Sequence, residues 1–187
     1  MPVRVDAVVV EVADLDLDRV PLRGEVIMGA LSSRAPVQAL VAIGANLGDA
    51  KGSVLLAIEA LGRLPQTRCL RVSSLYRTAP FQAQGPDFVN AVVMLETTLS
   101  APDLLQALQA LEHAAGRERP YLHAPRTLDL DIVTFGEATI NSPHLTLPHP
   151  RWRERAFVVC PLRDVDPERV SEAVLNAVAG QIIERLE

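Results

Sequence analysis

Short apolar runs alternate along most of this chain with segments that repeat apolar side chains at helical spacing, and no other feature constrains the fold as strongly. Glycine, proline and serine residues separate these segments from residue 38 onward. The pattern predicts strands over 38–43, 67–76, 88–97 and 127–135 and helices over 49–62 and 100–116. Their β-α-β-β-α-β order favours a ferredoxin-like α+β fold, in which helices pack on an antiparallel sheet.

The two ends of the chain differ from this central pattern. Residues 1–36 carry six acidic side chains and drift through glycine, serine and proline, which predicts an appendage without a chemical signature. Residues 150–159 predict a short helix, and residues 168–186 are amphipathic at helical spacing, so we expect a C-terminal helical extension. A chain of 187 residues fits one domain with such additions, so we assign residues 37–187 to the main domain.

The composition excludes several classes of protein. Hydrophobic residues make up 49% and charged residues 22% of the chain, unlike a disordered sequence, and no apolar run approaches the ~20 residues of a membrane helix. The net charge of −5 argues against a surface that binds nucleic acid. With two cysteines and no basic segment leading into an apolar one at the start, we expect a cytoplasmic monomer without membrane or nucleic-acid partners.

Arginine dominates the basic residues, with 17 arginines and one lysine. Arg117, Arg119 and Arg126 lie close together in one polar segment. Because a guanidinium group can grip phosphate oxygens with two hydrogen bonds, these residues suit a small polyanion. The alternative is an ordinary solvated loop that is rich in arginine.

Two aspartates stand in the strand predicted over 127–135. Side chains two apart on a strand point to the same face at ~6.5 Å separation, so Asp129 and Asp131 direct two carboxylates to one place. Leu130 and Ile132 then face the core. Hard oxygen ligands suit Mg²⁺, which binds through one or two carboxylates, water and phosphate oxygens. The alternative for the same pattern is an acidic strand face exposed to solvent.

Six segments resemble, in the same order, the signature sequences of the 6-hydroxymethyl-7,8-dihydropterin pyrophosphokinase family. They occupy residues 42–49, 73–78, 87–90, 116–119, 124–132 and 147–149, within a match that spans about 38–170. The resemblance implies transfer of the β,γ-pyrophosphate of ATP to 6-hydroxymethyl-7,8-dihydropterin, giving the pterin diphosphate and AMP, in folate biosynthesis. It also implies two Mg²⁺ ions on Asp129 and Asp131.

The same resemblance assigns residues to each substrate. Those implied for ATP are Gln109, Glu112, Arg117, Arg126, Ile132, Thr146, His149 and Arg155. Those implied for the pterin are Thr78, Pro80, Phe81, Phe88, Asn90 and Phe157. Those implied for catalysis are Arg117, Arg119, Arg126, Asp129 and Asp131. An asparagine can pair with the amide and amino edge of a pterin, and an aromatic ring can stack on its face.

Several of these residues also fit plain structural roles. The alternatives are an exposed helix face for Gln109 and Glu112, a turn for His149, the solvated surface for Arg155, the core for Phe88 and Phe157, and a strand start for Asn90. The segment 117–126 departs from the family pattern because it lacks the tryptophan that often stands there, which leaves Tyr121 and His123 as candidates to cover the pterin in its place.

Two other functions stay open from the sequence. One is a different Mg²⁺-dependent nucleotidyltransferase or phosphotransferase that uses the same pair of aspartates. The other is a non-catalytic ligand-binding module, because a fold of this kind does not by itself imply an activity. The joint presence of both aspartates, the arginines and Asn90 favours the enzyme.

Overall fold

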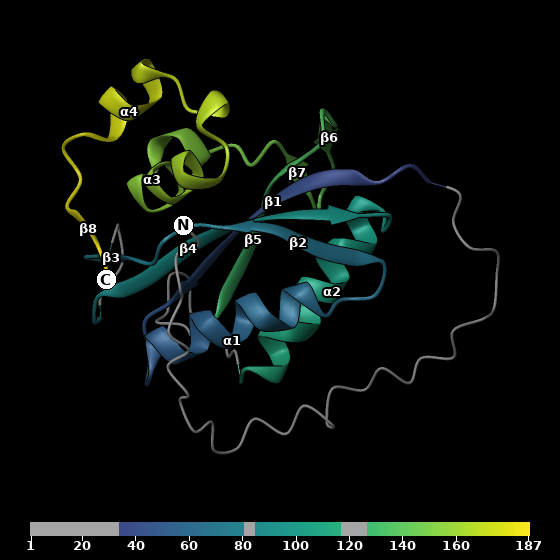
Figure 1. The fold of residues 1–187 in the computed structure, drawn as a ribbon, viewed down its shortest axis with the longest axis horizontal. Coiled ribbons are helices and arrows are strands. Elements are labelled where there is room, and N and C mark those ends of the chain that lie inside the picture. The colour runs from purple at the N-terminus through teal and green to yellow at the C-terminus, as the bar shows by residue number, and fades with distance from the viewer. Residues whose placement is uncertain (1–33, 81–84, 117–126) are drawn as a thin grey trace, which may run out of the picture.

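The computed structural model describes residues 34–80, 85–116 and 127–187, and an antiparallel sheet runs through this part of the chain (Figure 1). Its strands are β1 (Val37–Ala45), β2 (Thr67–Val72), β3 (Tyr76–Thr78), β4 (Phe88–Thr97), β5 (Asp129–Phe135) and β8 (Ile183–Arg185). They follow the order β5-β1-β4-β3-β8, and β2 pairs with β4 beside β3. The predicted α+β class with an antiparallel sheet is therefore confirmed.

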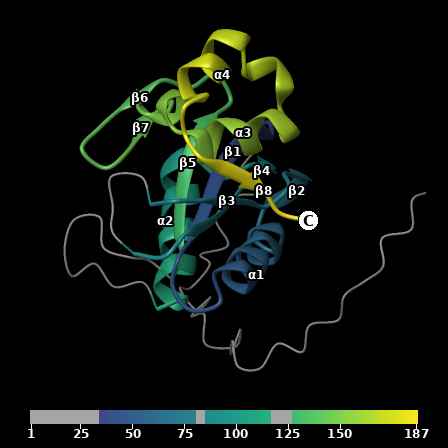
Figure 2. The ribbon, with the colours of Figure 1, turned by 90° about the vertical axis from the view of Figure 1, so that its left-hand side faces the viewer.

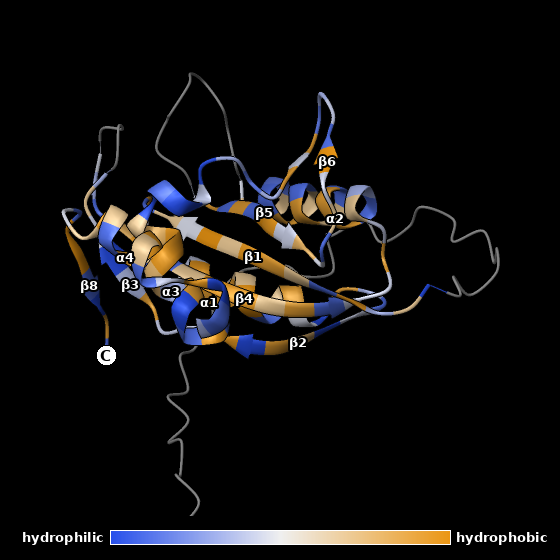
Figure 3. Cartoon of the chain, turned by 90° about the horizontal axis from the view of Figure 1, so that it is seen from above, coloured by the Kyte–Doolittle hydropathy of each residue, from blue (hydrophilic) through white to orange (hydrophobic). Residues whose placement is uncertain are grey.

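Helices cover both faces of this sheet. α1 (Ala50–Gly62) and α2 (Ala101–Ala114) pack on one face, and α3 (Ala156–Val165) packs on the other with α4 (Glu172–Val178) beside it (Figure 2). Two separate apolar cores result. Val41 and Ile43 of β1 belong to the core under α1 and α2, whereas Leu40 belongs to the core under α3. Because alternate side chains of β1 are buried on opposite faces, the apolar colouring of β1 and β4 in Figure 3 is nearly continuous.

Side-chain caps begin α1 and α2 at the positions that the sequence predicts. Asp49 accepts a hydrogen bond from the backbone N–H of Gly52 at the start of α1 (2.9 Å). Ser100 and Asp103 form a reciprocal capping box at the start of α2, where a proline occupies the first turn. These caps satisfy backbone N–H groups that have no partner within the helix.

The predicted strand over 67–76 is interrupted. It forms β2 and β3, which both pair with β4, with a break between them. At the break, the Val92 N–H donates to the Ser73 hydroxyl (2.9 Å) while the Ser73 N–H donates to the Val92 carbonyl (2.9 Å). A side-chain oxygen thus replaces a backbone carbonyl in the ladder, and the strand changes course without leaving a buried N–H unpaired.

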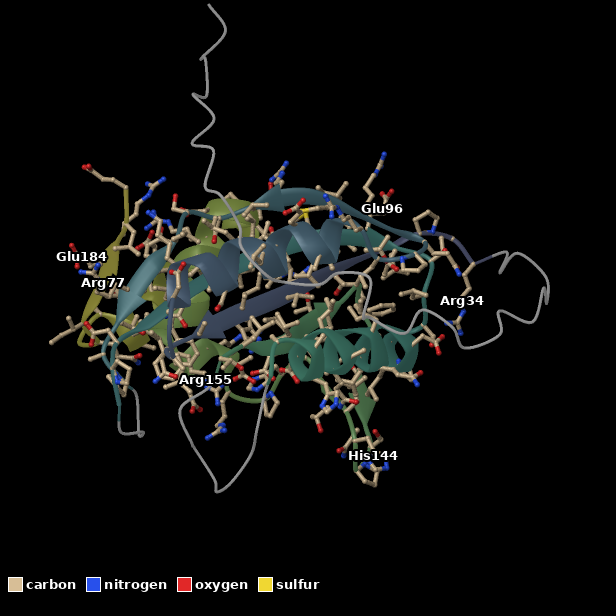
Figure 4. All side chains as sticks on the ribbon, turned by 90° about the horizontal axis from the view of Figure 1, so that it is seen from below. Arg34, Arg77, Glu96, His144, Arg155 and Glu184 are labelled. Carbon is tan, nitrogen blue, oxygen red and sulfur yellow. The ribbon has the colours of Figure 1, made fainter. Side chains whose placement is uncertain are left out.

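The C-terminal segment also differs from the expectation of one long amphipathic helix over 168–186. A 3₁₀ turn, η3 (Pro167–Arg169), precedes α4, and α4 ends at Val178 shortly before Gly180. The chain then extends and β8 pairs with β3, placing Ile183 opposite Thr78. Arg77 and Glu184 lie beside each other at this edge, 3.5 Å apart (Figure 4). Glycine disfavours helix, and the free edge of β3 offers a backbone partner for β-branched residues.

Smaller differences occur between β5 and α3. Residues 136–149, over which the sequence pattern predicts neither a strand nor a helix, contain the two-stranded pair β6 (Ile140–Asn141) and β7 (Thr146–Leu147). The helix predicted over 150–159 is instead a 3₁₀ turn, η2 (Trp152–Glu154), followed by α3, which continues to Val165. No helix in the described part of the chain is long and apolar enough to cross a membrane. The expected appendage lies, apart from residues 34–36, outside the described residues.

Candidate functional site

The two aspartates of β5 lie on one face of the sheet, as their spacing predicts. Leu130 and Ile132 alternate with them and are buried in the core under α1 and α2. Asp129 and Asp131 therefore face the side covered by α3, where both are half-buried. Among the described residues, no group of three or more His, Cys, Asp or Glu side chains could hold a metal ion. Two carboxylates still fit Mg²⁺, because this ion takes its other ligands from water and phosphate oxygens.

Arg155 links the aspartate pair to an aromatic ring. Its Nη1 lies 3.9 Å from Asp131 Oδ2, and its guanidinium carbon lies 5.4 Å from the centre of the Phe157 ring. The Arg155 side chain is only 15% exposed, against 46% for Asp131. Arg155 is thus not the solvated surface residue that the sequence left as an alternative. A guanidinium held in this way can meet a phosphate oxygen with little further loss of side-chain freedom.

His149 is fixed by hydrogen bonds on both sides. Its backbone N–H donates to the Val133 carbonyl of β5 (2.9 Å), and its ring Nδ1 accepts from the Arg151 N–H (3.2 Å). Burial, and then the positive charges of Arg155 and Arg151, lower the pKa of His149 to about 4. The ring is therefore neutral at pH 7, with its proton on Nε2. Nδ1 accepts a hydrogen bond within the turn, as the structural alternative for His149 predicts. The N–H at Nε2 can donate a hydrogen bond to a ligand.

A second polar group lies on the same face of the sheet as the aspartates, two strands away. Asn90 of β4 is 4% exposed, and its Nδ2 donates to the Thr78 hydroxyl of β3 (2.9 Å). Phe88 stands two residues earlier on the same strand and is half-buried. Thr78 is paired with Phe88 in register, so these three side chains share one face. The structure thus brings together three of the residues predicted for the pterin.

Gly44 of β1 lies between the two groups. In register it pairs with Asn90 on one side and with Asp129 on the other. Neighbouring strands are ~4.8 Å apart, so the backbones that carry Asn90 and Asp129 are ~10 Å apart. A Cβ at Gly44 would lie 3.2 Å from Asn90 Oδ1 and 3.9 Å from a Phe88 ring carbon. Because Gly44 has no side chain, β1 does not fill the space beside the Asn90 carbonyl oxygen on the side of the aspartates.

The sequence motifs predict no role for Gly44, although its position within a strand is itself a signal. A glycine inside a strand has a weaker packing role than any other residue and often marks a close approach to a ligand or a backbone. Asn46, two residues later, was also not assigned. It is buried, and its Nδ2 donates to the Pro86 carbonyl (3.2 Å), which ties the end of β1 to the approach to β4.

The remaining assigned residues divide into four groups. Gln109 is exposed on α2, whereas Glu112 is buried and accepts the N–H of Leu130 (2.7 Å). Ile132 has its side chain in the core, so a contact with ATP would have to use its backbone. The residues with partly or fully accessible side chains are Pro80, Thr146 and Phe157. Those outside the described residues are Phe81, Arg117, Arg119, Tyr121, His123 and Arg126.

The fold is an α+β protein with a candidate small-molecule site on one sheet face, where a carboxylate pair and an arginine lie on one side of a glycine and a buried amide lies on the other. The family model for 7,8-dihydro-6-hydroxymethylpterin-pyrophosphokinase (HPPK) matches residues 40–167. The chain belongs to this family, which confirms the resemblance seen in its sequence motifs.

Similar proteins agree with this assignment. The chain is 46% identical over 129 residues to the 2-amino-4-hydroxy-6-hydroxymethyldihydropteridine pyrophosphokinase of Pseudomonas aeruginosa, a match that covers 68% of this chain and 80% of that protein. It is 36% identical over 149 residues to the protein of the same name from Synechocystis, covering 80% of this chain and 76% of that one.

Solved structures show the same fold at lower sequence identity. Plasmodium falciparum HPPK-DHPS with pterin and p-hydroxybenzoate superposes with a TM-score of 0.59 at 15% identity, covering 76% of this chain and 42% of that chain. HPPK-DHPS in complex with substrates gives a TM-score of 0.61 at 13% identity, with 76% and 43% covered. This chain therefore spans about two fifths of those longer proteins.

The lowered pKa of His149 predicts a stability that depends on pH. A free histidine titrates near 6.5, so between pH 6.5 and about 4 the unfolded chain binds a proton that the folded chain does not. The free energy of unfolding should therefore fall as the pH drops from about 6.5 toward about 4. The free energy of unfolding, measured with urea at about pH 7.5 and about pH 5, should differ less between the two pH values for His149→Asn than for wild type.

A matched control is His144→Asn, because His144 is exposed beside the β6–β7 pair (Figure 4). It should keep the wild-type pH dependence. An unchanged pH dependence in His149→Asn would contradict the environment described for this ring.

Proposed function

We propose that this protein transfers the terminal diphosphate of ATP to the hydroxymethyl group of 6-hydroxymethyl-7,8-dihydropterin, giving the pterin diphosphate and AMP, as a step of folate biosynthesis. The observation that carries the proposal is the row Asp129–Gly44–Asn90 across the sheet in a chain of this family. It offers a metal-binding end and a ring-binding end, and on the strand between them the residue in register is a glycine.

The ring-binding end suits a flat heterocycle with a polar edge. Because Asn90 donates to Thr78, its carbonyl oxygen is directed toward Gly44 and can accept from the amide or amino group of a pterin. Phe88 lies beside this oxygen and Phe157 stands near the start of α3. Either ring offers an apolar face for stacking.

The other end suits the triphosphate and its cation. Asp129 and Asp131 would hold Mg²⁺, and we propose two ions. When bound, Mg²⁺ neutralises phosphate charge and makes the acceptor hydroxyl more acidic. Arg155 lies beside Asp131 and can pair with a phosphate oxygen, and the neutral His149 can donate from Nε2. The predicted contributions of Arg117, Arg119 and Arg126 to this end stay predictions.

The reaction then requires little covalent chemistry from the protein. The pterin hydroxyl oxygen attacks the β-phosphorus, the bond from that phosphorus to the oxygen shared with the α-phosphate breaks, and AMP leaves with that oxygen. The hydroxyl proton passes to solvent. Most of the rate enhancement would come from holding the two substrates in line and from neutralising charge.

Other parts of the expected picture belong to the same proposal. The strand order, with β4 lying between β1 and the β2–β3 pair, supports a ferredoxin-like arrangement extended at its C-terminus. We also propose a cytoplasmic monomer that binds neither nucleic acid nor membranes. Membership of the family makes a different nucleotidyltransferase, or a module without catalysis, the less favoured alternative.

The nucleotide product tests the proposed reaction. The protein, ATP, Mg²⁺ and 6-hydroxymethyl-7,8-dihydropterin should yield AMP in step with the pterin diphosphate, because attack at the β-phosphorus moves the diphosphate intact. Separation of the nucleotides by anion exchange measures this, and a reaction without pterin serves as the control. Formation of ADP would reveal ordinary kinase chemistry and exclude the proposal.

Replacing either β5 aspartate should disable the reaction without unfolding the chain. Asp129→Asn or Asp131→Asn removes one negative charge at nearly constant shape, so turnover should fall at least ~10²-fold. Steady-state kinetics at limiting Mg²⁺ measures the loss, and circular dichroism checks the fold. Glu137→Gln is a control, because that side chain is 92% exposed. Near wild-type turnover in both aspartate variants would refute the assignment.

Adding a methyl group at Gly44 should weaken pterin binding selectively. Gly44→Ala places a Cβ 3.2 Å from Asn90 Oδ1, so the amide must shift and the space above the strand narrows. We expect the pterin Kd, measured by calorimetry with a saturating uncleavable ATP analogue and Mg²⁺, to rise at least ~10-fold, equivalent to about 1.4 kcal/mol. Affinity for the analogue should stay unchanged.

Alanine is better tolerated than glycine within a strand, so the melting temperature of Gly44→Ala should change little. Gly62→Ala is the matched control, since a Cβ there meets only an ordinary contact with Cys69 at 3.7 Å. Wild-type pterin affinity in Gly44→Ala would show that no ligand passes over this strand.

A further inference from the structure

Strand β5, which carries both aspartates, lies at the edge of the described sheet. Only β1 pairs with it there as a ladder partner, so its other side depends on groups from elsewhere to fix its backbone. His149 provides one such group through its N–H on the Val133 carbonyl. The second lies nearer the aspartates, at Leu130, whose N–H donates to Glu112 Oε1 at 2.7 Å.

The position of Glu112 is unfavourable for the stability of α2 itself. It stands in the last turn of the helix, where the helix dipole disfavours a negative charge. It is also only 5% exposed, and a buried carboxylate requires hydrogen bonds to offset its lost hydration. The hydrogen bond from the Leu130 N–H supplies part of this compensation. It also ties the carboxylate to the strand that holds Asp129 and Asp131.

Gln109, one turn earlier on α2, behaves differently. Its side chain is exposed, whereas Glu112 is buried and its Oε1 accepts a hydrogen bond from the main chain of β5. The family resemblance assigns both residues to the adenosine part of ATP. The geometry separates them, with Gln109 free to meet a ligand and Glu112 directed at the strand.

We propose that Glu112 is a positioning residue. Its carboxylate holds the main chain of β5 at Leu130, so that the flanking Asp129 and Asp131 present a fixed pair of oxygens to Mg²⁺. The inference rests on the proposed function, because it assigns the aspartates to the metal of MgATP. It goes beyond that function in making metal affinity depend on a helix residue that need not touch metal or nucleotide.

Three substitutions separate the hydrogen bond from the charge. Glu112→Gln keeps an acceptor oxygen at the same reach and removes the charge. Glu112→Asp keeps the charge, but its side chain is one methylene too short to maintain the 2.7 Å bond. Glu112→Leu removes both. If Glu112→Leu does not fold, the first two variants still decide between the bond and the charge.

The measurement is the Kd of α,β-methylene ATP by calorimetry, with Mg²⁺ and with chelator, on the full chain. For wild type and Glu112→Gln, Mg²⁺ should tighten binding by the same factor within about threefold. For Glu112→Asp and Glu112→Leu, that factor should fall at least ~10-fold, or about 1.4 kcal/mol, while the metal-free Kd changes less than about threefold. In the metal-free protein, exchange of the Leu130 amide hydrogen should be faster in these two variants than in Glu112→Gln.

Gln109→Leu provides the contrast. If Gln109 contacts the nucleotide, this substitution should raise the Kd of the analogue by the same factor with and without Mg²⁺. The same equal loss in Glu112→Leu would overturn the inference, as would a Glu112→Asp variant that matches wild type while Glu112→Gln fails. If wild type itself binds the analogue regardless of Mg²⁺, the proposed function fails and the inference with it, so the two failures are distinguishable.

Discussion

The register of β1 between β4 and β5 is the constraint on which the rest of the molecule depends. It aligns Asp129, Gly44 and Asn90 across three strands. Because side chains alternate between faces, a slip of one residue would turn the aspartates toward the core under α1 and α2. It would also turn Leu130 and its apolar neighbours toward the polar side. Burial of those apolar side chains therefore determines where the acidic ones point, and the chemistry of the site follows from hydrophobic packing.

The polar face is built at the margin of a second core, not on a bare surface. α3 covers the sheet with three buried valines and Leu162, and the residues at its start are Arg155, Ala156 and Phe157. The same helix is anchored near its far end, where Asp164 accepts from the Ser74 N–H (3.1 Å) and the Tyr76 hydroxyl (3.0 Å). Burial, and then this hydrogen bond, raise the pKa of Tyr76 to about 12. These two hydrogen bonds fix α3, and with it Arg155 at its start, against β3 and the residues just before β3.

Local sequence patterns predict the helices and the aspartate pair, whereas other parts of the site depend on contacts between residues that are distant in the sequence. The helices starting at Asp49 and Ser100 follow from caps and periodicity, and the aspartate pair follows from strand alternation. β8 could not be anticipated, because its residues continue an amphipathic pattern and become a strand only when β3 offers an edge. The role of Glu112 was hidden for a similar reason, since its partner is a backbone N–H of a distant strand.

The opposite charges of Arg155 and Asp131 lie close together in the site, and a bound ion could take the place of either partner. Arg155 stands 3.9 Å from Asp131, a separation at which the pair attracts without a direct hydrogen bond, and the Phe157 ring supports the guanidinium without neutralising it. A cation on Asp131 would release Arg155 toward an arriving anion, and an anion on Arg155 would release Asp131 toward a cation. His149 stays neutral beside them, so it adds a donor without adding a competing charge. With the substrates proposed above, a divalent cation on Asp131 and a polyphosphate on Arg155 would each weaken the attraction that opposes the other, which would favour binding of the two as a complex.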